Sequence, residues 1–167
     1  MRIQKCRICR SEDIKLFLKL GDHPSADAFI EASRLKEEEV CVPLEVCACQ
    51  ECGLIQLNHT VPASQLYDKS YIYESSITQM GQKHWTEFSK TAAEIGCLGT
   101  DELVVDIGSN VGVLLEKFRE QGAKVLGVDP APTIVKLAHK RGIETVESFF
   151  DFGTAQSIRK EKSSANL

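Results

Sequence analysis

The order of hydrophobic and polar positions differs between the two parts of the chain. Up to about residue 60, apolar residues occur in short alternating runs, such as IKLFLKLG (14–21) and PLEVCAC (43–49), without long helical periodicity. Alternation with a period of two is typical of half-buried strands. We therefore expect a small β-rich module over residues 1–60.

A helix is predicted next, over residues 76–96, with Gly96 as its stop signal. The apolar positions near helical spacing are Ile77, Met80, Trp85, Phe88, Ala92 and Ile95. We interpret residues 61–98 as an irregular connection followed by this packing helix. A role of Trp85 as a platform for a ligand is the less favoured interpretation.

From residue 99 onwards, runs typical of strands alternate with runs typical of helices. The expected strands are 103–108, 124–129 and 143–146, and the expected helices are 111–122, 132–142 and 153–162. This alternation indicates parallel βαβ units. The final SSANL resembles the start of a further strand, so residues 99–167 are expected to form an incomplete Rossmann-like domain. The predicted fold class is α/β.

Composition and charge exclude some classes of protein. The chain has 167 residues, of which 43% are hydrophobic, and a formal net charge of −4. A protein that mainly holds nucleic acid needs a clustered positive field, which this chain lacks. No run reaches the roughly 18 apolar residues of a membrane span, and no signal peptide is visible. We expect a cytoplasmic protein without membrane or nucleic-acid partners; the sequence indicates no oligomeric state.

Six of the seven cysteines lie before residue 60. Cys6 and Cys9 form one C-x-x-C pair, and Cys49 and Cys52 form a second pair, with 39 residues between the two pairs. Two such turns can supply four thiolates to a structural zinc ion, which leaves no open position for catalysis. A redox dithiol, four unrelated buried thiols, and Cys47 in place of Cys49 are the alternatives. Cys41 and Cys97 are interpreted as small apolar side chains.

The stretch VVDIGSNVG carries the second candidate site, because it lies where a strand turns into a helix. Gly108 and Gly112 let the backbone approach a ligand, and the helix N-terminus favours an anionic group. Asn110 stands where a dinucleotide fingerprint has glycine, while Asp106 can accept from an ammonium group. Asp129 ends the next strand and can hold ribose hydroxyls. Either acid alone can also be explained as a turn-capping residue.

These residues resemble the cofactor site of class I S-adenosylmethionine (SAM)-dependent methyltransferases, in VVDIGSNVG followed by VLGVDPAP. The wider motif order is similar to the N-terminal half of the zinc-containing C-methyltransferases, which act on nucleotide-linked 4-keto-deoxysugars. The motifs are CRIC, LGDHPSADAF, PLEVCACQECGLIQL, VP, SYIYESS, VVDIGSNVG, GVDPAP and SFF. The family commonly has an acid where Val111 stands.

The resemblance implies roles for the candidate residues. The implied structural zinc ligands are Cys6, Cys9, Cys49 and Cys52. The implied SAM-binding residues are Asp106, Gly108 and Gly112 at the methionine end and Asp129 at the ribose, with Asn110 in the same loop. Tyr71 and Tyr73 match a tyrosine pair near the sugar pocket, whereas the residues alone favour half-buried loop packing for them.

The resemblance also implies a reaction in which a base removes a proton beside the ketone and the enolate attacks the sulfonium methyl. The base should be a histidine or a carboxylate. The family's histidine lies on a later segment, and the histidines of this chain (His23, His59, His84 and His139) do not match its motif. We therefore assign no catalytic residue, and interpret the chain as an N-terminal fragment that binds cofactor weakly and transfers no methyl group.

Two other functions compete with this interpretation. A zinc-ribbon module that binds protein or nucleic acid would need basic and aromatic residues on its face, and the acidic KEEE stretch argues against nucleic acid. A nicotinamide-dependent enzyme is disfavoured by Asn110 in the glycine loop.

Overall fold

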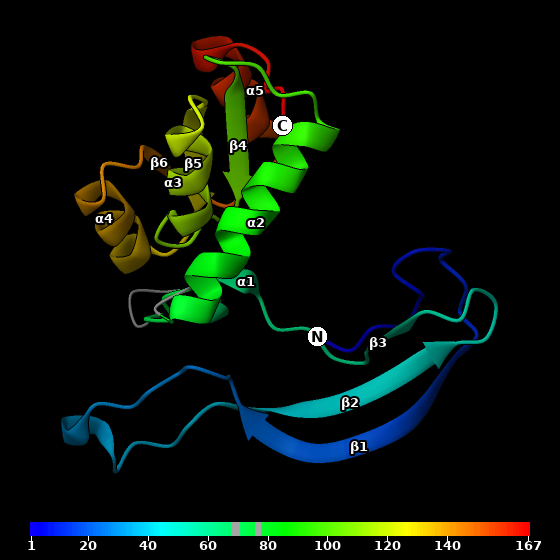
Figure 1. Ribbon diagram of the computed structural model, residues 1–167. Coiled ribbons are helices and arrows are strands. Elements are labelled where there is room, and N and C mark those ends of the chain that lie inside the picture. The colour runs from blue at the N-terminus through cyan, green and yellow to red at the C-terminus, as the bar shows by residue number, and fades with distance from the viewer. Residues whose placement is uncertain (68–70, 76–77) are drawn as a thin grey trace. The chain divides into compact units, whose positions relative to one another are not determined.

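The computed structural model describes residues 1–67, 71–75 and 78–167, and they form two compact units, Met1–Leu66 and Tyr67–Leu167 (Figure 1). The first unit is a Cys-rich β structure, and the second is a parallel sheet with helices. The predicted α/β class is therefore confirmed, with a partial Rossmann-like arrangement in the second unit. Within the described residues, no helix is long and apolar enough to cross a membrane.

The first unit is an antiparallel sheet of three strands in the order β1-β2-β3. Its elements are β1 (Ile14–Pro24), the 3-10 helix η1 (Ala32–Arg34), β2 (Cys41–Cys49), β3 (Ile55–Leu57) and α1 (Ala63–Leu66). The two alternating runs are strands, as predicted, and both extend further than the pattern indicated. Strand β3 and helix α1 were not predicted, because segments of three or four residues have no readable period.

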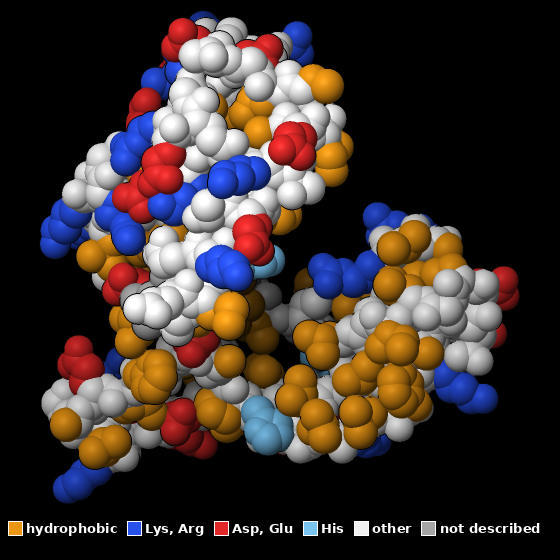
Figure 2. All heavy atoms as spheres, viewed as in Figure 1, with side chains coloured by type: hydrophobic (Ala, Val, Ile, Leu, Met, Phe, Trp, Pro, Cys, Tyr) orange, Lys and Arg blue, Asp and Glu red, His pale blue; other side chains and the backbone are white. Residues whose placement is uncertain are grey.

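The first unit buries little apolar surface. Exposed hydrophobic side chains include Phe17, Leu20, Ile55 and Leu57, and Figure 2 shows hydrophobic side chains gathered over its sheet. Among the described residues of this unit, the buried hydrophobic side chains are all cysteines: Cys6, Cys47 and Cys49. A module with so small a core needs another source of stability.

The second unit is built on a parallel sheet in the order β4-β5-β6 (Figure 1). Its elements are α2 (Gln79–Ile95), β4 (Leu103–Ile107), α3 (Val113–Glu120), β5 (Lys124–Asp129), α4 (Pro132–Lys140), β6 (Thr145–Glu147) and α5 (Phe152–Lys162). Alternation along β4 directs its side chains to opposite faces of the sheet. Val104 packs with residues of α3 and α4, whereas Leu103 packs with Ile158 of α5.

Helix α2 is present, and its packing face is confirmed only in part, since Trp85 packs against an apolar cluster as predicted. Met80, Phe88 and Ile95 are exposed, and Ile77 lies outside the described residues. The residue of α2 that is fully buried is Ser89, whose hydroxyl accepts a hydrogen bond from Gln121 Nε2 at 2.9 Å. Ala92 packs against the core as predicted. Helical spacing alone could not separate the two faces, since apolar residues lie on both.

The last residues of the chain hydrogen-bond to β4. The Asn166 and Leu167 amides donate to Leu103 O at 2.8 and 3.4 Å, and the Val105 amide donates to Leu167 O at 3.0 Å. Leu167 thus bonds to Leu103 and Val105, the two neighbours of Val104, which is the hydrogen-bond pattern of two parallel strands. This is the arrangement expected if SSANL begins a strand beside β4.

Candidate functional site

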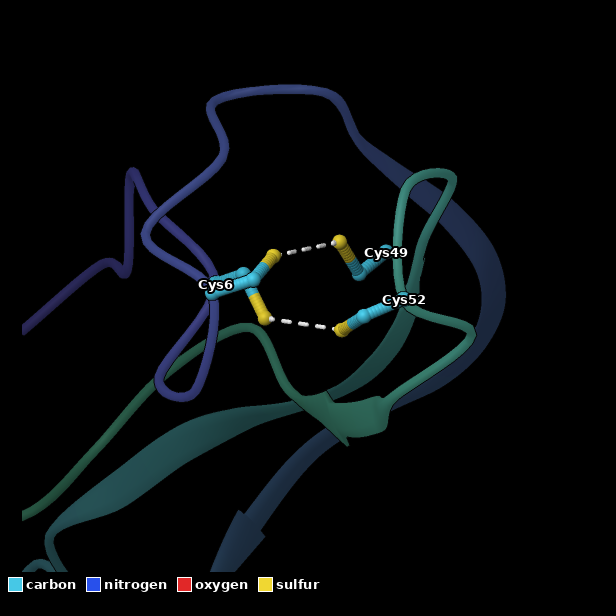
Figure 3. A group of neighbouring side chains, drawn as sticks. Cys6, Cys49 and Cys52 are labelled. Carbon is cyan, nitrogen blue, oxygen red and sulfur yellow. Dashed lines mark hydrogen bonds between the residues drawn. The ribbon is translucent and has the colours of Figure 1, made fainter.

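The four predicted zinc ligands come together at one end of the first unit's sheet, and Figure 3 labels three of them, Cys6, Cys49 and Cys52. Cys6 and Cys9 lie on the loop before β1, and Cys49 ends β2 just before the turn that carries Cys52. Gly53 follows with φ +74°, a left-handed conformation that favours glycine. Pairing of β1 with β2 places Ile14 beside Cys49 and so brings the two C-x-x-C turns together.

The geometry of these sulfur atoms fits a tetrahedral metal ion. All four Sγ atoms lie within 4.8 Å of one another. Cys6 Sγ lies 3.6 Å from Cys52 Sγ, and Cys9 Sγ lies 3.5 Å from Cys49 Sγ. Zinc–sulfur bonds of about 2.3 Å in a tetrahedron require sulfur separations of about 3.8 Å. The donor set and its size therefore support zinc.

The pKa values of the thiols at this site are spread apart. Burial acts to raise the pKa of Cys6, but hydrogen bonds from backbone amides and neighbouring thiols lower it to about 6. A backbone hydrogen bond acts to lower the pKa of Cys9, but the adjacent thiols and burial raise it to about 12. Zinc binds cysteines as thiolates, so binding of the ion must displace the protons of these thiols.

The other cysteines do not join this cluster. Cys47 is buried and its Sγ donates to Gln56 O at 3.4 Å, so it does not replace Cys49. Cys41 and Cys97 are exposed. Their interpretation as small apolar side chains outside the metal cluster stays a prediction, and neither belongs to the buried core.

The second site is the turn between β4 and α3. Gly108, Asn110 and Gly112 all have positive φ, at +75°, +52° and +78°. A Cβ on Gly112 would lie 2.9 Å from Ile143 Cγ1, so glycine is needed there for packing. Alternating left-handed residues fold the turn tightly before α3 begins at Val113.

A cavity of about 260 Å³ opens beside this turn in the second unit. Its lining residues are Tyr71, Tyr73, Ser75, Trp85, Asp106, Gly108, Ser109, Asn110 and Leu114. The structure therefore brings together five of the seven predicted cofactor- and substrate-binding residues at one cavity: Tyr71, Tyr73, Asp106, Gly108 and Asn110.

The other two predicted residues, Gly112 and Asp129, are not among the residues that line this cavity. The Asp129 carboxylate is buried and accepts from the Asn110 amide at 3.0 Å and the Ala131 amide at 2.9 Å. It therefore holds the turn in shape, and its contact with ribose hydroxyls stays a prediction. Gly112 faces Ile143 and starts α3.

The Asp106 carboxyl has a strongly shifted pKa. Burial, and secondly repulsion from the Asp129 carboxylate, raise its pKa to about 6. A half-buried carboxylate with a negative neighbour is stabilised by a cationic ligand. Asp106 at the cavity wall is thus suited to an ammonium group near neutral pH.

Sequence reasoning missed three lining residues, Ser75, Ser109 and Leu114, and favoured only packing for Trp85. Ser109 is buried, and its hydroxyl has no hydrogen-bond partner among the described residues. This hydroxyl lies against Gly127 of β5, where an added Cβ would meet it, so it is not presented to the cavity. Of these residues, Ser109 could have been found from its place inside the glycine loop.

Comparison with known proteins agrees with these features. Residues 6–67 match the model of the Methyltransf_13 family, which describes a zinc-binding domain. The chain is also similar to C-methyltransferase NovU of Streptomyces niveus, with 31% identity over 165 residues. That alignment covers 99% of this chain and 39% of NovU, so the chain spans about two fifths of the relative's length. The resemblance to zinc-containing C-methyltransferases is thereby confirmed.

Proposed function

We propose that this chain binds SAM in the cavity between β4 and α3, as part of a C-methyltransferase that acts on a nucleotide-linked 4-keto-deoxysugar. The observation that carries the proposal is Asp106 and the glycine turn, which line one cavity at the carboxyl end of β4. Ligands of open α/β sheets bind at this edge. The similarity to C-methyltransferase NovU supports the same conclusion.

The hydrogen bonds of the glycine turn favour SAM over a dinucleotide. Dinucleotide sites use this turn and the helix N-terminus to approach a pyrophosphate. Here every amide from Gly108 to Gly112 already donates within the protein, two of them to Val128 O and one to Asp129. The turn therefore offers the Asp106 carboxylate to a ligand in place of free amides.

Each residue of the site has a role in this proposal. Asp106, when ionised, accepts hydrogen bonds from the ammonium group of the cofactor. Asp129 accepts from ribose hydroxyls with the lone pairs that its two amide bonds leave. Tyr71 and Tyr73 face the acceptor sugar. SAM, when bound, supplies an electrophilic methyl group, and Trp85 and Leu114 help to exclude water from the cavity.

Zinc has a structural role in the proposal. Four cysteine ligands complete its coordination and leave no position for a substrate. The thiols must stay reduced to bind it, which agrees with a cytoplasmic location.

We propose further that the purified chain binds SAM without transferring methyl groups. Among the described residues, the cavity lining contains no histidine that could act as base. Asp106 cannot serve as the base while it holds the cofactor ammonium.

Equilibrium dialysis tests the proposal. The zinc-loaded chain is dialysed in parallel against SAM, NAD and a DNA duplex, and then assayed for methyl transfer to a nucleotide-linked 4-keto-deoxysugar. We expect saturable binding of SAM alone, and no turnover. Binding of NAD or duplex without SAM would contradict the proposed cofactor, and turnover would contradict the inactivity of the chain.

A further inference from the structure

The Asn110 side chain connects the glycine turn to the segment that carries the two tyrosines. Its Nδ2 donates to Tyr73 O at 2.8 Å, and its Oδ1 accepts from the Ser75 amide at 2.9 Å. Oδ1 also accepts from the Val111 amide at 2.9 Å. One amide side chain thus uses both its ends to hold backbone groups that are 35 and 37 positions away in the sequence.

The backbone of Asn110 is fixed from the other side. Its amide donates to the buried Asp129 carboxylate at 3.0 Å, and its φ of +52° directs the chain sharply through the turn. Asparagine tolerates this left-handed conformation better than most residues. The side chain therefore extends from a rigid base.

The side chains of the tyrosine segment also make contacts within the second unit. Tyr73 is exposed, and Tyr71 packs on the apolar cluster of Val111, Val113, Ala131 and Ile134. Tyr71 also meets the Tyr67 ring edge-on, with centroids 5.1 Å apart. Apolar packing is not directional, whereas the two hydrogen bonds of Asn110 fix the backbone of residues 73 and 75 at defined distances.

We propose that Asn110 is a positioning residue, which fastens residues 73–75 to the glycine turn and so keeps Tyr71 and Tyr73 as one wall of the cofactor cavity. The consequence is that the cofactor loop and the acceptor-facing tyrosines move as one piece. The identification of the ligand as SAM rests on the proposed function. The attachment of residues 73–75 to Asn110 rests on hydrogen bonds alone.

Hydrogen exchange at the Ser75 amide, followed by NMR on the full chain, tests the fastening without any ligand. In the wild-type chain we expect this amide to exchange at least about tenfold more slowly than in an unstructured peptide. No protection there would overturn the proposal.

The variant Asn110→Gly removes the side-chain hydrogen bonds but keeps the backbone conformation, since glycine readily adopts the left-handed region. We expect roughly tenfold faster exchange at Ser75, unchanged exchange in β5, and a several-fold weaker affinity for SAM. Asp101→Gly is the matched control, because Asp101 also has positive φ, at +66°, and its carboxylate pairs with Lys124 instead. Unchanged Ser75 exchange in Asn110→Gly would overturn the proposal.

Asn110→Asp keeps the oxygen that accepts from Ser75 and removes the donor to Tyr73. We expect the Ser75 amide to stay protected in this variant, which a general loss of folding would not permit. If the wild-type chain binds no SAM, the proposed cofactor is wrong, and the exchange at Ser75 still decides whether Asn110 positions the segment.

Discussion

At the scale of single residues, the turn between β4 and α3 is set by side chains that bond to backbone rather than to each other. Asp129 fixes the Asn110 and Ala131 amides, and Asn110 fixes Ser75 and Tyr73. Val111, where related methyltransferases commonly have an acid, is buried in the apolar cluster beneath. The turn therefore presents Asp106 as the acidic side chain of the cavity wall.

Replacement of Gly112 by alanine tests the packing of this turn. Alanine must adopt φ +78°, and its Cβ would approach Ile143 to 2.9 Å. We expect a loss of about 1–3 kcal/mol in the free energy of unfolding, measured by denaturant titration. Gly153→Ala is the control, because Gly153 lies inside α5 with no positive φ and its Cβ would have only an ordinary contact, at 3.4 Å from Asp151 Oδ1. A Gly112→Ala chain as stable as Gly153→Ala would contradict the argument.

The raised pKa of Asp106 predicts that SAM binding depends on pH. The carboxyl is ionised above its pKa of about 6 and neutral below it, and the cofactor ammonium needs the ionised form. We expect the dissociation constant for SAM to be about tenfold larger at pH 5 than at pH 7. Calorimetric titration at both pH values measures this change.

Asp106→Asn is the control for that titration. Its free energy of unfolding, compared with that of the wild-type chain, is a second measurement. Because the folded pKa is raised from 3.8, the group's contribution to stability is present below pH 4 and is lost as pH rises through 6. The variant should thus be more stable than wild type at pH 7, while binding SAM at least about tenfold more weakly. A variant that binds as tightly as wild type would exclude an ammonium contact at Asp106.

At the scale of elements, the sequence predicted the strands and helices whose hydrophobic pattern is long or is limited by polar and turn residues at both ends. The β5 prediction has the observed limits, Lys124 to Asp129, because polar and turn residues bound its apolar run. The packing face of α2 was predicted in part, at Trp85 and Ala92. The burial of Ser89 was not predicted, because its partner Gln121 is distant in sequence. The hydrogen bonds of the Asn110 side chain could not be predicted from the sequence either, since its partners lie 35 or more positions away.

The cysteine turns before β1 and after β2 allow a matched pair of substitutions. Cys9 and Cys41 are both exposed, so neither change removes core packing. We expect Cys9→Ser to bind far less than one zinc ion per chain and to lose the β1–β2 sheet, and Cys41→Ser to keep both. Metal content by mass spectrometry and circular dichroism measure these outcomes; equal zinc content in the two variants would contradict the four-cysteine site.

At the scale of the whole molecule, the two units obtain their stability differently. The second unit has apolar clusters on both faces of its sheet. In the first unit the buried hydrophobic side chains, among the residues described, are cysteines. Bound zinc contributes on the order of 10 kcal/mol to modules of this kind, so the first unit should depend on the metal and the second should not.

Removal of zinc with a chelator tests whether only the first unit depends on the metal. We expect amides of β1 and β2 to lose hydrogen-exchange protection after chelation, while amides of β4 and β5 keep theirs. Re-addition of zinc should restore the first set. Loss of protection in both units, or in neither, would show that the metal does not stabilise the first unit separately.

The central claim, that SAM occupies the cavity beside the glycine turn, is tested most directly by tryptophan fluorescence. Trp85 is the single tryptophan of the chain and lines that cavity, so its emission reports on this site. We predict a saturable change in emission with SAM that is absent with NAD and strongly weakened in Asp106→Asn. A trace that stays flat with SAM, or that changes equally with NAD, would contradict the account.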